Sequence, residues 1–146
     1  MDRFEFSEDA AGRLGSAVAP STRGGDVVVT EHSVEVSFGE PPTFHSVIPR
    51  SQIEAMRRLP DLKGLTRGVH GRRGRWLVNR AGSGLVELRI QPPASAVLDI
   101  ARAIGGQKVG KISGWLVRRF SGRQIALRRL TISLKDPDGF MESLKG

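Results

Sequence analysis

The stretch that decides the fold is DVVVTEHSVEVSFG, residues 26–39. Its apolar side chains recur at every second position on both sides of a short polar segment, Glu31–Ser33. Period-two spacing of β-branched and aromatic residues is typical of a strand that buries one face. Two such strands across a short polar turn predict a β-hairpin. We therefore expect an antiparallel sheet that begins at this hairpin.

The segments that follow extend the same pattern. PPTFHSVIP, residues 41–49, predicts a third strand bounded by prolines. SQIEAMRRL, residues 51–59, fits either a helix or a strand, and we favour a strand because its neighbours are strands. GRWLVNRAGSGLVELRI, residues 74–90, predicts a second hairpin that turns at AGSG. Pro92 and Pro93 are expected to end its second strand.

The last third of the chain predicts two helices and one more strand. ASAVLDIARAIGG, residues 94–106, spaces apolar residues at helical intervals and stops at two glycines. GRQIALRRLTISLK, residues 122–135, returns to strand spacing. In DPDGFMESLKG, Asp136 is a natural N-cap and Pro137 suits the first helical turn. The predicted fold class is mainly β (α+β): a small antiparallel barrel or sandwich of about seven strands, with a C-terminal capping helix and one inserted helix.

Three of these phrases resemble bacterial pleckstrin-homology-like (PH-like) proteins. VVVTEHSVEVSFG, FHSVIPRSQI and LTISLKDPDGFMESL look like the opening hairpin, the third and fourth strands, and the last strand with its helix. The middle stretch, GVHGRRGRWLVN followed by GLVELRI, is similar to small proteins of GC-rich actinobacteria with this layout. The resemblance implies one PH-like domain over residues 26–146. Residues 1–25 form a separate N-terminal segment, for which partial disorder is one alternative.

Length and composition fit a single globular domain of 146 residues, 38% of them hydrophobic and 26% charged. The chain has no cysteine, which excludes disulfides, thiolate metal sites and cysteine nucleophiles. The first residues are acidic where a signal peptide would be basic, and no apolar run is long enough to cross a membrane. We therefore expect a cytoplasmic protein.

The net charge of +8 is distributed unevenly along the chain. Residues 1–49 contain three basic and eight acidic side chains, whereas residues 50–135 contain nineteen basic and four acidic ones. Such asymmetry favours a surface that attracts anions. The alternative is that the excess of arginine over lysine reflects GC-rich coding and that the basic surface only confers solubility.

GGQKVGKIS, residues 105–113, has the spacing of a phosphate-binding loop but lacks its setting. Ile112 stands where the magnesium-binding Ser or Thr would be, and the preceding residues indicate a helix instead of a strand. Too little chain follows Lys111 to build the parallel sheet of a nucleotide-binding fold. We expect no nucleotide hydrolysis.

Other catalytic patterns are also missing from the sequence. His32, His45 and His70 are too widely separated for a typical zinc motif. Ser83 lies in AGSGL, which lacks the Gly-x-Ser-x-Gly pattern and fits a hairpin turn. No carboxylate pair stands out. We expect a protein that is not an enzyme and that uses no metal or cofactor.

Two basic segments remain as binding candidates: HGRRGR, residues 70–75, and KVGKISGWLVRRFSGR, residues 108–123. Arginine forks suit phosphate oxygens, and aromatic residues suit a lipid interface or a nucleic-acid base. The anion-binding candidates are His70, Arg72, Arg73, Arg75, Lys108, Lys111, Arg118, Arg119 and Arg123. The apolar interface candidates are Trp115, Leu116 and Phe120. The alternatives are a flexible loop before a strand for the first segment, and a packed element with a solvated basic edge for the second.

The inositol-phosphate site of PH domains is not implied by the resemblance. That site places its basic cluster across the first hairpin, where this chain has Asp26, Glu31 and Glu35 and no Lys or Arg. Our leading hypothesis is a non-catalytic module that binds an acidic lipid surface or an acidic protein segment through its middle and late basic segments. The alternatives are nucleic-acid binding by the same surface, and a scaffold or homo-oligomer subunit that uses apolar patches.

Overall fold

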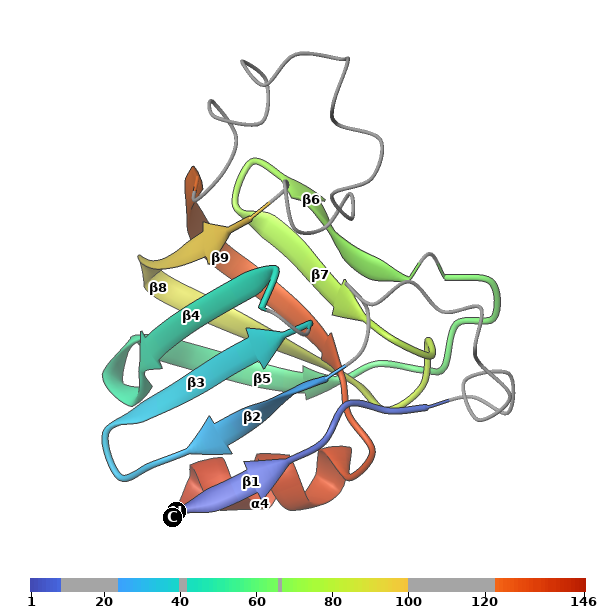
Figure 1. Cartoon of the computed structure of the whole chain (residues 1–146). Helices are drawn as coiled ribbons and strands as arrows, with labels where there is room; N and C mark the ends of the chain where they lie inside the picture. Colours follow the sequence, from blue (N-terminus) through green and yellow to red (C-terminus); the bar gives the residue numbers. More distant parts are fainter. Residues whose placement is uncertain (9–23, 40–41, 66, 100–122) are drawn as a thin grey trace.

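The computed structural model describes residues 1–8, 24–39, 42–65, 67–99 and 123–146 (Figure 1). Within that part of the chain, nine strands form one sheet. The strands are β1 (Asp2–Phe4), β2 (Gly25–Val29), β3 (Ser33–Phe38), β4 (Phe44–Pro49), β5 (Ile53–Arg58), β6 (Gly68–Arg72), β7 (Arg75–Asn79), β8 (Leu85–Leu98) and β9 (Arg123–Ser133). A 3-10 turn, η2 (Arg50–Gln52), separates β4 from β5, and helix α4 (Pro137–Lys145) follows β9.

The sheet is open, with strand order β1-β2-β3-β4-β8-β9-β7-β6, and β5 pairs with β8. The mainly β fold class with a C-terminal helix is confirmed. The prediction of about seven strands in a closed barrel or a sandwich is wrong. Strand β7 runs parallel to β9, so the β6–β7 hairpin extends the sheet outward from β9. An isolated antiparallel bridge between Phe6 and Leu134 joins the N-terminal segment to the chain that leaves β9, with flanking backbone hydrogen bonds from the Ser7 amide to the Ser133 carbonyl oxygen and from the Lys135 amide to the Glu5 carbonyl oxygen.

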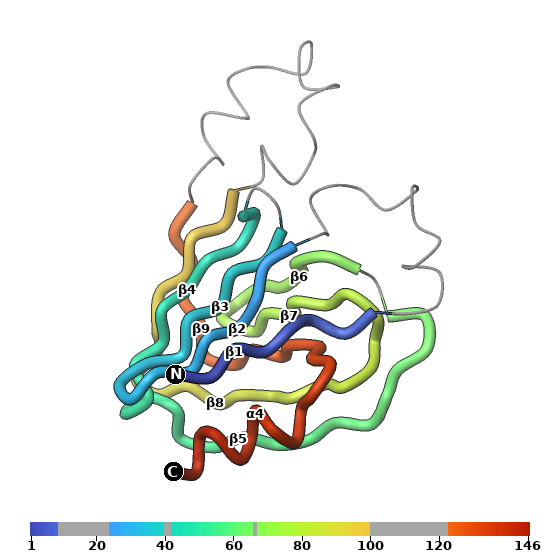
Figure 2. The backbone as a smooth tube through the Cα atoms, turned by 60° about the horizontal axis from the view of Figure 1, so that its bottom comes forward, coloured from blue at the N-terminus to red at the C-terminus, as the bar shows by residue number. Residues whose placement is uncertain are grey.

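Strand β8 connects the two ends of the sheet. It pairs with β9 along most of its length, with β5 at its beginning and with β4 at its end. Its register against β9 shifts between Arg89 and Ala94, and the η2 turn lies between its two partners on the other side. The sheet therefore bends where β5 gives way to β4, as the curved path of β8 in Figure 2 shows.

Two predictions about this region are wrong. Pro92 and Pro93 do not end the strand, because they fall in the irregular part of β8, where a missing backbone donor breaks no ladder. Residues 94–98 of the predicted helix at 94–106 are the last part of β8, where buried and exposed side chains alternate between two partner strands. The rest of that predicted helix, apart from Asp99, lies outside the described residues.

The predicted hairpin at 74–90 is also wrong, although both of its strands exist. Strand β9 lies between β7 and β8 and pairs with each of them. The segments at 26–39, 41–49 and 122–135 form strands, as their patterns predicted, and 51–59 forms a strand, as we expected from its neighbours. What the spacing did not specify was which strands pair.

The core lies on the inward face of the sheet and beneath α4. Its buried apolar side chains come from β2, β3, β4, β7, β8, β9 and the helix. Asp136 caps the helix as predicted, since its Oδ1 accepts a hydrogen bond from the Gly139 amide at 3.0 Å. Phe140 is completely buried, and its ring meets that of Phe4 edge-on at 5.6 Å between centroids. The helix thereby fastens β1 to the core.

The N-terminal residues belong to the fold, whereas the sequence indicated a domain that starts at residue 26. Strand β1 pairs with β2, and Phe6 is only 1% exposed. The Phe6 ring packs edge-on against Phe38, with 5.0 Å between the ring centroids. Residues 9–23 of the expected N-terminal segment lie outside the described part of the chain.

A partly buried cation strengthens this contact. The guanidinium carbon of Arg80 lies 5.2 Å from the centroid of Phe6 and 5.3 Å from that of Phe38, so it faces two aromatic rings. Burial lowers the pKa of Arg80, and the nearby Glu8 and Glu5 carboxylates act in the opposite direction. Arg80 therefore stabilises the docking of the N-terminal segment and is a structural residue.

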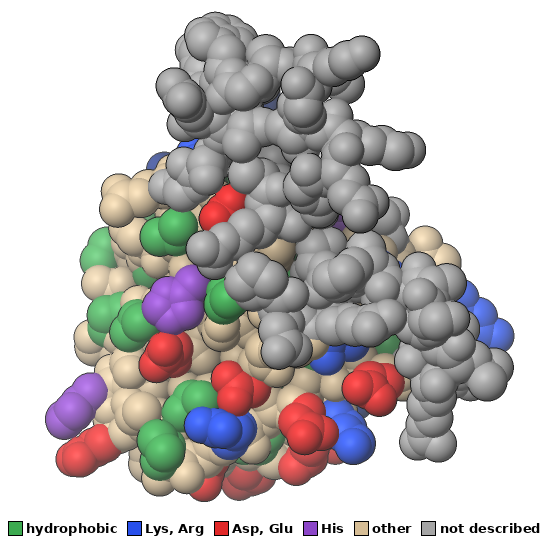
Figure 3. Space-filling model, in the orientation of Figure 1, with side chains coloured by type: hydrophobic (Ala, Val, Ile, Leu, Met, Phe, Trp, Pro, Cys, Tyr) green, Lys and Arg blue, Asp and Glu red, His purple; other side chains and the backbone are tan. Residues whose placement is uncertain are grey.

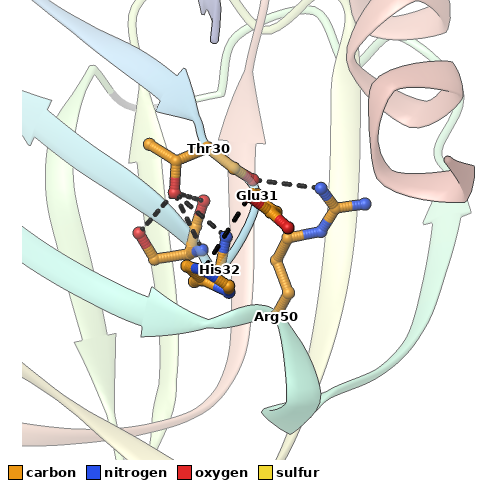
Figure 4. A network of polar contacts seen from close by, with 5 residues as sticks. Thr30, Glu31, His32 and Arg50 are labelled. Carbon is orange, nitrogen blue, oxygen red and sulfur yellow. Dashed lines mark hydrogen bonds and ion pairs between the residues drawn. The ribbon is translucent and has the colours of Figure 1, made fainter.

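Arg50 links the first hairpin to the end of the helix (Figure 4). Thr30 Oγ1 accepts hydrogen bonds from the His32 and Ser33 amides at 3.3 and 3.0 Å and so fixes the β2–β3 turn. The Arg50 guanidinium donates to the Thr30 carbonyl oxygen at 3.0 Å. It also donates to three carbonyl oxygens at and after the end of α4, at 2.8–3.3 Å. Arg50 therefore has a structural role, because it joins the β2–β3 turn to the end of α4.

Replacing Phe6 with alanine tests whether the N-terminal segment is part of the core. We expect Phe6→Ala to lower the free energy of unfolding by about 3–5 kcal/mol, because it removes a buried ring and leaves a cavity. Leu62→Ala is the control, since Leu62 is 47% exposed and its loss should have little effect. Urea unfolding followed by circular dichroism measures both. Equal stabilities for the two variants would show that residues 1–8 do not contribute to the core.

Candidate anion-binding site

The candidate site begins at the hairpin of β6 and β7. Arg72 and Arg75 lie opposite each other, and Arg73 and Gly74 form the two-residue turn between them. Both turn residues have positive φ, 53° and 80°, which is the combination that a type I′ turn requires. We predicted a loop up to Gly74 and a strand only from Arg75; the structure instead makes Gly68–Arg72 a strand. The HGRRGR segment is therefore the tip of a paired hairpin.

The parallel pairing of β7 with β9 brings a second arginine pair to this tip. Arg75 is the register partner of Arg129. The Gly74 carbonyl oxygen accepts hydrogen bonds from the amides of Arg128 and Arg129, at 2.8 and 3.0 Å. The side chain of Arg128 packs directly over Gly74, where an added Cβ would lie 2.9 Å from its Cγ. Glycine is thus required at this position both for its backbone conformation and for space.

Four arginines line up across four adjacent strands. The register pairs Arg72 of β6 with Arg75 of β7, Arg75 with Arg129 of β9, and Arg129 with Arg89 of β8. Register partners on adjacent strands present their side chains on the same face of a sheet. We call these four residues the arginine row. With strands about 4.8 Å apart, the row extends about 14 Å across the sheet.

A hollow of about 650 Å³ lies beside the arginine row. Its described lining consists of one glycine and five arginines: Gly71, Arg72, Arg73, Arg75, Arg128 and Arg129. Volumes of this order are typical of sites for small molecules. The hollow therefore combines a high density of positive charge with a shape that can enclose part of a ligand.

Within the part of the chain that the structure describes, no carboxylate neutralises the charges in this hollow. Among the described residues, no carboxylate forms an ion pair with an arginine of the row, with Arg73 or with Arg128. Arginines elsewhere on the sheet do have such partners: Arg3 contacts Asp26 at 3.1 Å, and Arg57 contacts Glu87 at 3.1 Å. Adjacent like charges on a sheet repel each other. An anion from outside the described chain would relieve that repulsion.

Acidic side chains lie over the first strands instead. In Figure 3 they are scattered over the face formed by β1–β3, with few basic groups between them. Several of these carboxylates have basic partners, for example Asp26 with Arg3 at 3.1 Å and Glu35 with His45 Nε2 at 3.1 Å. This distribution agrees with the charge asymmetry in the sequence, because the arginine row lies on β6–β9 and not on these first strands.

The structure brings together only some of the residues that the sequence singled out. Arg72, Arg73 and Arg75 meet at the hollow. His70 is on β6 but does not line the hollow, and its Nε2 donates to the Arg67 carbonyl oxygen at 2.6 Å. Arg123 is the first residue of β9, six residues before Arg129, and so lies about 20 Å along the strand.

The remaining predicted residues lie outside the described part of the chain. They are the anion-binding candidates Lys108, Lys111, Arg118 and Arg119 and the apolar candidates Trp115, Leu116 and Phe120. The phosphate-loop-like segment at 105–113 also falls there. The hypothesis that residues 70–75 and 108–123 share one face therefore stays a prediction.

Sequence reasoning missed Arg89, Arg128 and Arg129. Arg89 alternates with buried residues on β8, so its position on the outer face was visible in the sequence. Arg128 and Arg129 occur in a stretch that was correctly predicted as a strand. Their proximity to the β6–β7 hairpin depends on the parallel pairing of β7 with β9, and period-two spacing carries no information about that pairing.

Other kinds of site are less supported. In the described residues, no group of three or more His, Cys, Asp or Glu side chains is arranged to hold a metal ion. No helix among them is long and apolar enough to cross a membrane. Ser83 supplies its carbonyl oxygen to a hydrogen bond from Ser7 Oγ at 3.0 Å, as part of a turn.

The chain matches no protein-family model, no curated protein and no solved structure. A functional hypothesis therefore depends on the chemistry of the arginine row and of the hollow beside it.

Neutralising the centre of the arginine row should stabilise the fold. We expect Arg75→Gln to raise the free energy of unfolding by about 0.2–1 kcal/mol at low salt, because Arg75 lies between Arg72 and Arg129. The gain should shrink at high salt, which screens exposed charges. Arg123→Gln is the matched control, because its register partner on β8 is the uncharged Leu98. Urea unfolding at two salt concentrations measures both variants, and a loss of stability in Arg75→Gln would contradict the repulsion.

Proposed function

We propose that the protein is a non-catalytic binding module that recognises a polyanionic partner, such as an acidic lipid surface or an acidic protein segment, through the arginine row. The observation that carries the proposal is the alignment of four arginines on four adjacent strands without a described carboxylate partner. An arginine outside such a cluster needs no explanation, since basic side chains are common on surfaces. A row of arginines in register lowers the stability of the sheet by charge repulsion unless an anion is bound.

The size of the repulsion supports this interpretation. Two unit charges about 5 Å apart, which is the spacing of neighbouring strands, repel by about 0.8 kcal/mol in water. Salt and the freedom of exposed side chains to turn apart reduce this value. The row contains three such neighbouring pairs. A bound polyanion replaces these repulsive terms with attractive ones and gains arginine hydrogen bonds, which are shorter and stronger when both groups are charged.

A relationship to PH-like proteins is part of the same proposal. The antiparallel run β1–β4 and the capped C-terminal helix support it, while the parallel pairing of β7 and β9 is a feature of this chain that the resemblance did not imply. The proposed binding surface is on β6–β9, away from the acidic first hairpin. A cytoplasmic location is likewise proposed, because the chain has no cysteine.

Replacing the hairpin arginines tests the proposed function. The variant Arg72→Ser, Arg73→Ser, Arg75→Ser should bind vesicles of phosphatidylcholine with phosphatidylserine at least tenfold more weakly than the wild type, because each basic residue near an anionic membrane contributes about 1 kcal/mol. Co-sedimentation at two salt concentrations measures the affinity, and binding should weaken as salt rises. Neutral phosphatidylcholine vesicles should not bind.

The matched control is Arg3→Ser, which removes an exposed cation that is already paired with Asp26. It should leave vesicle binding unchanged. Duplex DNA and a glutamate-rich peptide serve as parallel ligands in the same assay. If the wild type binds none of these polyanions, the proposed function is wrong, and an interaction through apolar surface becomes the better hypothesis. Preferential binding of DNA would identify the partner as nucleic acid.

A further inference from the structure

We propose that the ligand of the hollow is a compact anion that carries at least two phosphate groups, and that the protein prefers it to an acidic peptide. This inference rests on the proposed function, because it names the ligand class of the same site. It follows from the number of arginines, from their arrangement and from the size of the hollow, which are considered in turn.

The first argument is the number of guanidinium groups that a ligand must satisfy. Among the described residues, five arginines line the hollow. A carboxylate has two oxygens and matches one arginine fork, whereas a phosphate group offers three oxygens and can accept forks from two arginines. Five forks therefore call for about five carboxylates but only two or three phosphate groups.

The second argument is the length of the arginine row, along which the anionic groups of the ligand must be spaced. The arginine row extends about 14 Å, at about 4.8 Å per strand. An extended peptide presents side chains on one side every second residue, about 6.6 Å apart, so about three carboxylates would face the row. Two or three phosphate groups on one small molecule fit within the same distance and satisfy more forks. The spacing therefore favours phosphate over carboxylate.

The third argument is that the cations surround a space and do not form only a line. Arg73 belongs to the turn of the hairpin, and Arg128 packs over Gly74, so both lie beside the row and not in it. A chain laid along the row would reach these two side chains poorly. A compact ligand within the hollow of about 650 Å³ can contact all five lining arginines. The hollow is also of the size that small ligands occupy.

The residues that border the arginine row along the strands indicate on which side of it the phosphate groups would bind. On the same face, one row further along the strands, the register aligns His70, Leu77, Thr131 and Glu87. Glu87 is 18% exposed and is held by Arg57 at 3.1 Å. This row contains no arginine, the Leu77 side chain is apolar, and the Glu87 carboxylate repels phosphate. The phosphate groups are therefore expected to lie toward the tip of the β6–β7 hairpin.

Isothermal titration calorimetry with three small probes tests the proposal. Fructose 1,6-bisphosphate carries two phosphate groups, fructose 6-phosphate carries one, and triglutamate carries carboxylates at peptide spacing. We expect the bisphosphate to bind at least tenfold more tightly than either of the others. A triglutamate affinity equal to or greater than that of the bisphosphate overturns the phosphate preference. Equal affinities for the two sugar phosphates overturn the requirement for two groups.

Paired variants locate the binding. Arg75→Gln, Arg129→Gln should weaken bisphosphate binding at least tenfold, and it should fold, because it removes like charges from adjacent strands. Arg3→Gln removes an exposed arginine of β1 that is already paired with Asp26 and should change the affinity less than twofold. Equal losses in the two variants would mean that general charge, and not the hollow, holds the ligand.

The outcomes separate this inference from the proposed function. If acidic vesicles or acidic peptides bind and the bisphosphate does not, the module binds polyanions but the phosphate preference is wrong. If neither the probes nor the vesicles bind, both proposals fail. Vesicles that contain phosphatidic acid distinguish two sources of the same chemistry. Vesicle binding that the bisphosphate displaces supports the proposal with a lipid headgroup as ligand, and bisphosphate binding without vesicle binding supports it with a soluble molecule.

Discussion

The fold depends on the pairing of β8 with three other strands. Through that pairing, β8 aligns β9 on one side and both β5 and β4 on the other, so it connects the first strands to the last ones. Its irregular middle lets the sheet bend between the two partners. Once β9 is fixed along β8, its free edge is available to β7, and the arginines of four strands come into register. The candidate site is thus a consequence of how the longest strand is paired.

Local patterns in the sequence predicted the strands and the C-terminal helix better than they predicted which strands pair. Alternating valines at 26–39, the cap at Asp136 and the strand at 122–135 all depend on residues that are close together in the chain, and the structure confirms them. The predicted pairing of 75–79 with 85–90 was wrong, because adjacency in sequence favours a hairpin while the structure inserts β9 between the two strands. The helix predicted at 94–106 was wrong over 94–98, because the alternation of Ala94 and Ala96 with their exposed neighbours was weaker in the sequence than the helical spacing of the larger residues.

The same distinction applies to the candidate site. The sequence identified Arg72, Arg73 and Arg75 because they lie close together in the chain, within residues 72–75. Arg89 is exposed and Arg129 is partly buried on predicted strands, and they become notable only when the register places Arg129 beside Arg75 and Arg89 beside Arg129. A cluster assembled across strands cannot be recognised from composition, since nothing in the sequence marks which exposed positions share a row. The arginine row can be recognised only when the parallel pairing of β7 with β9 is known.

The contact between the N-terminal segment and the end of β9 has a consequence for how the chain reaches its native state. Phe6 bridges Leu134, and Lys135 pairs with Glu5 across 130 residues at 3.4 Å. Contacts between residues so distant in sequence must wait for loop closure and are typical of slow-folding topologies. During synthesis, the Phe6 ring therefore remains without its final neighbours until nearly all of the described chain has left the ribosome. The contact of Phe6 with Leu134 can therefore form only after β9 has been synthesised.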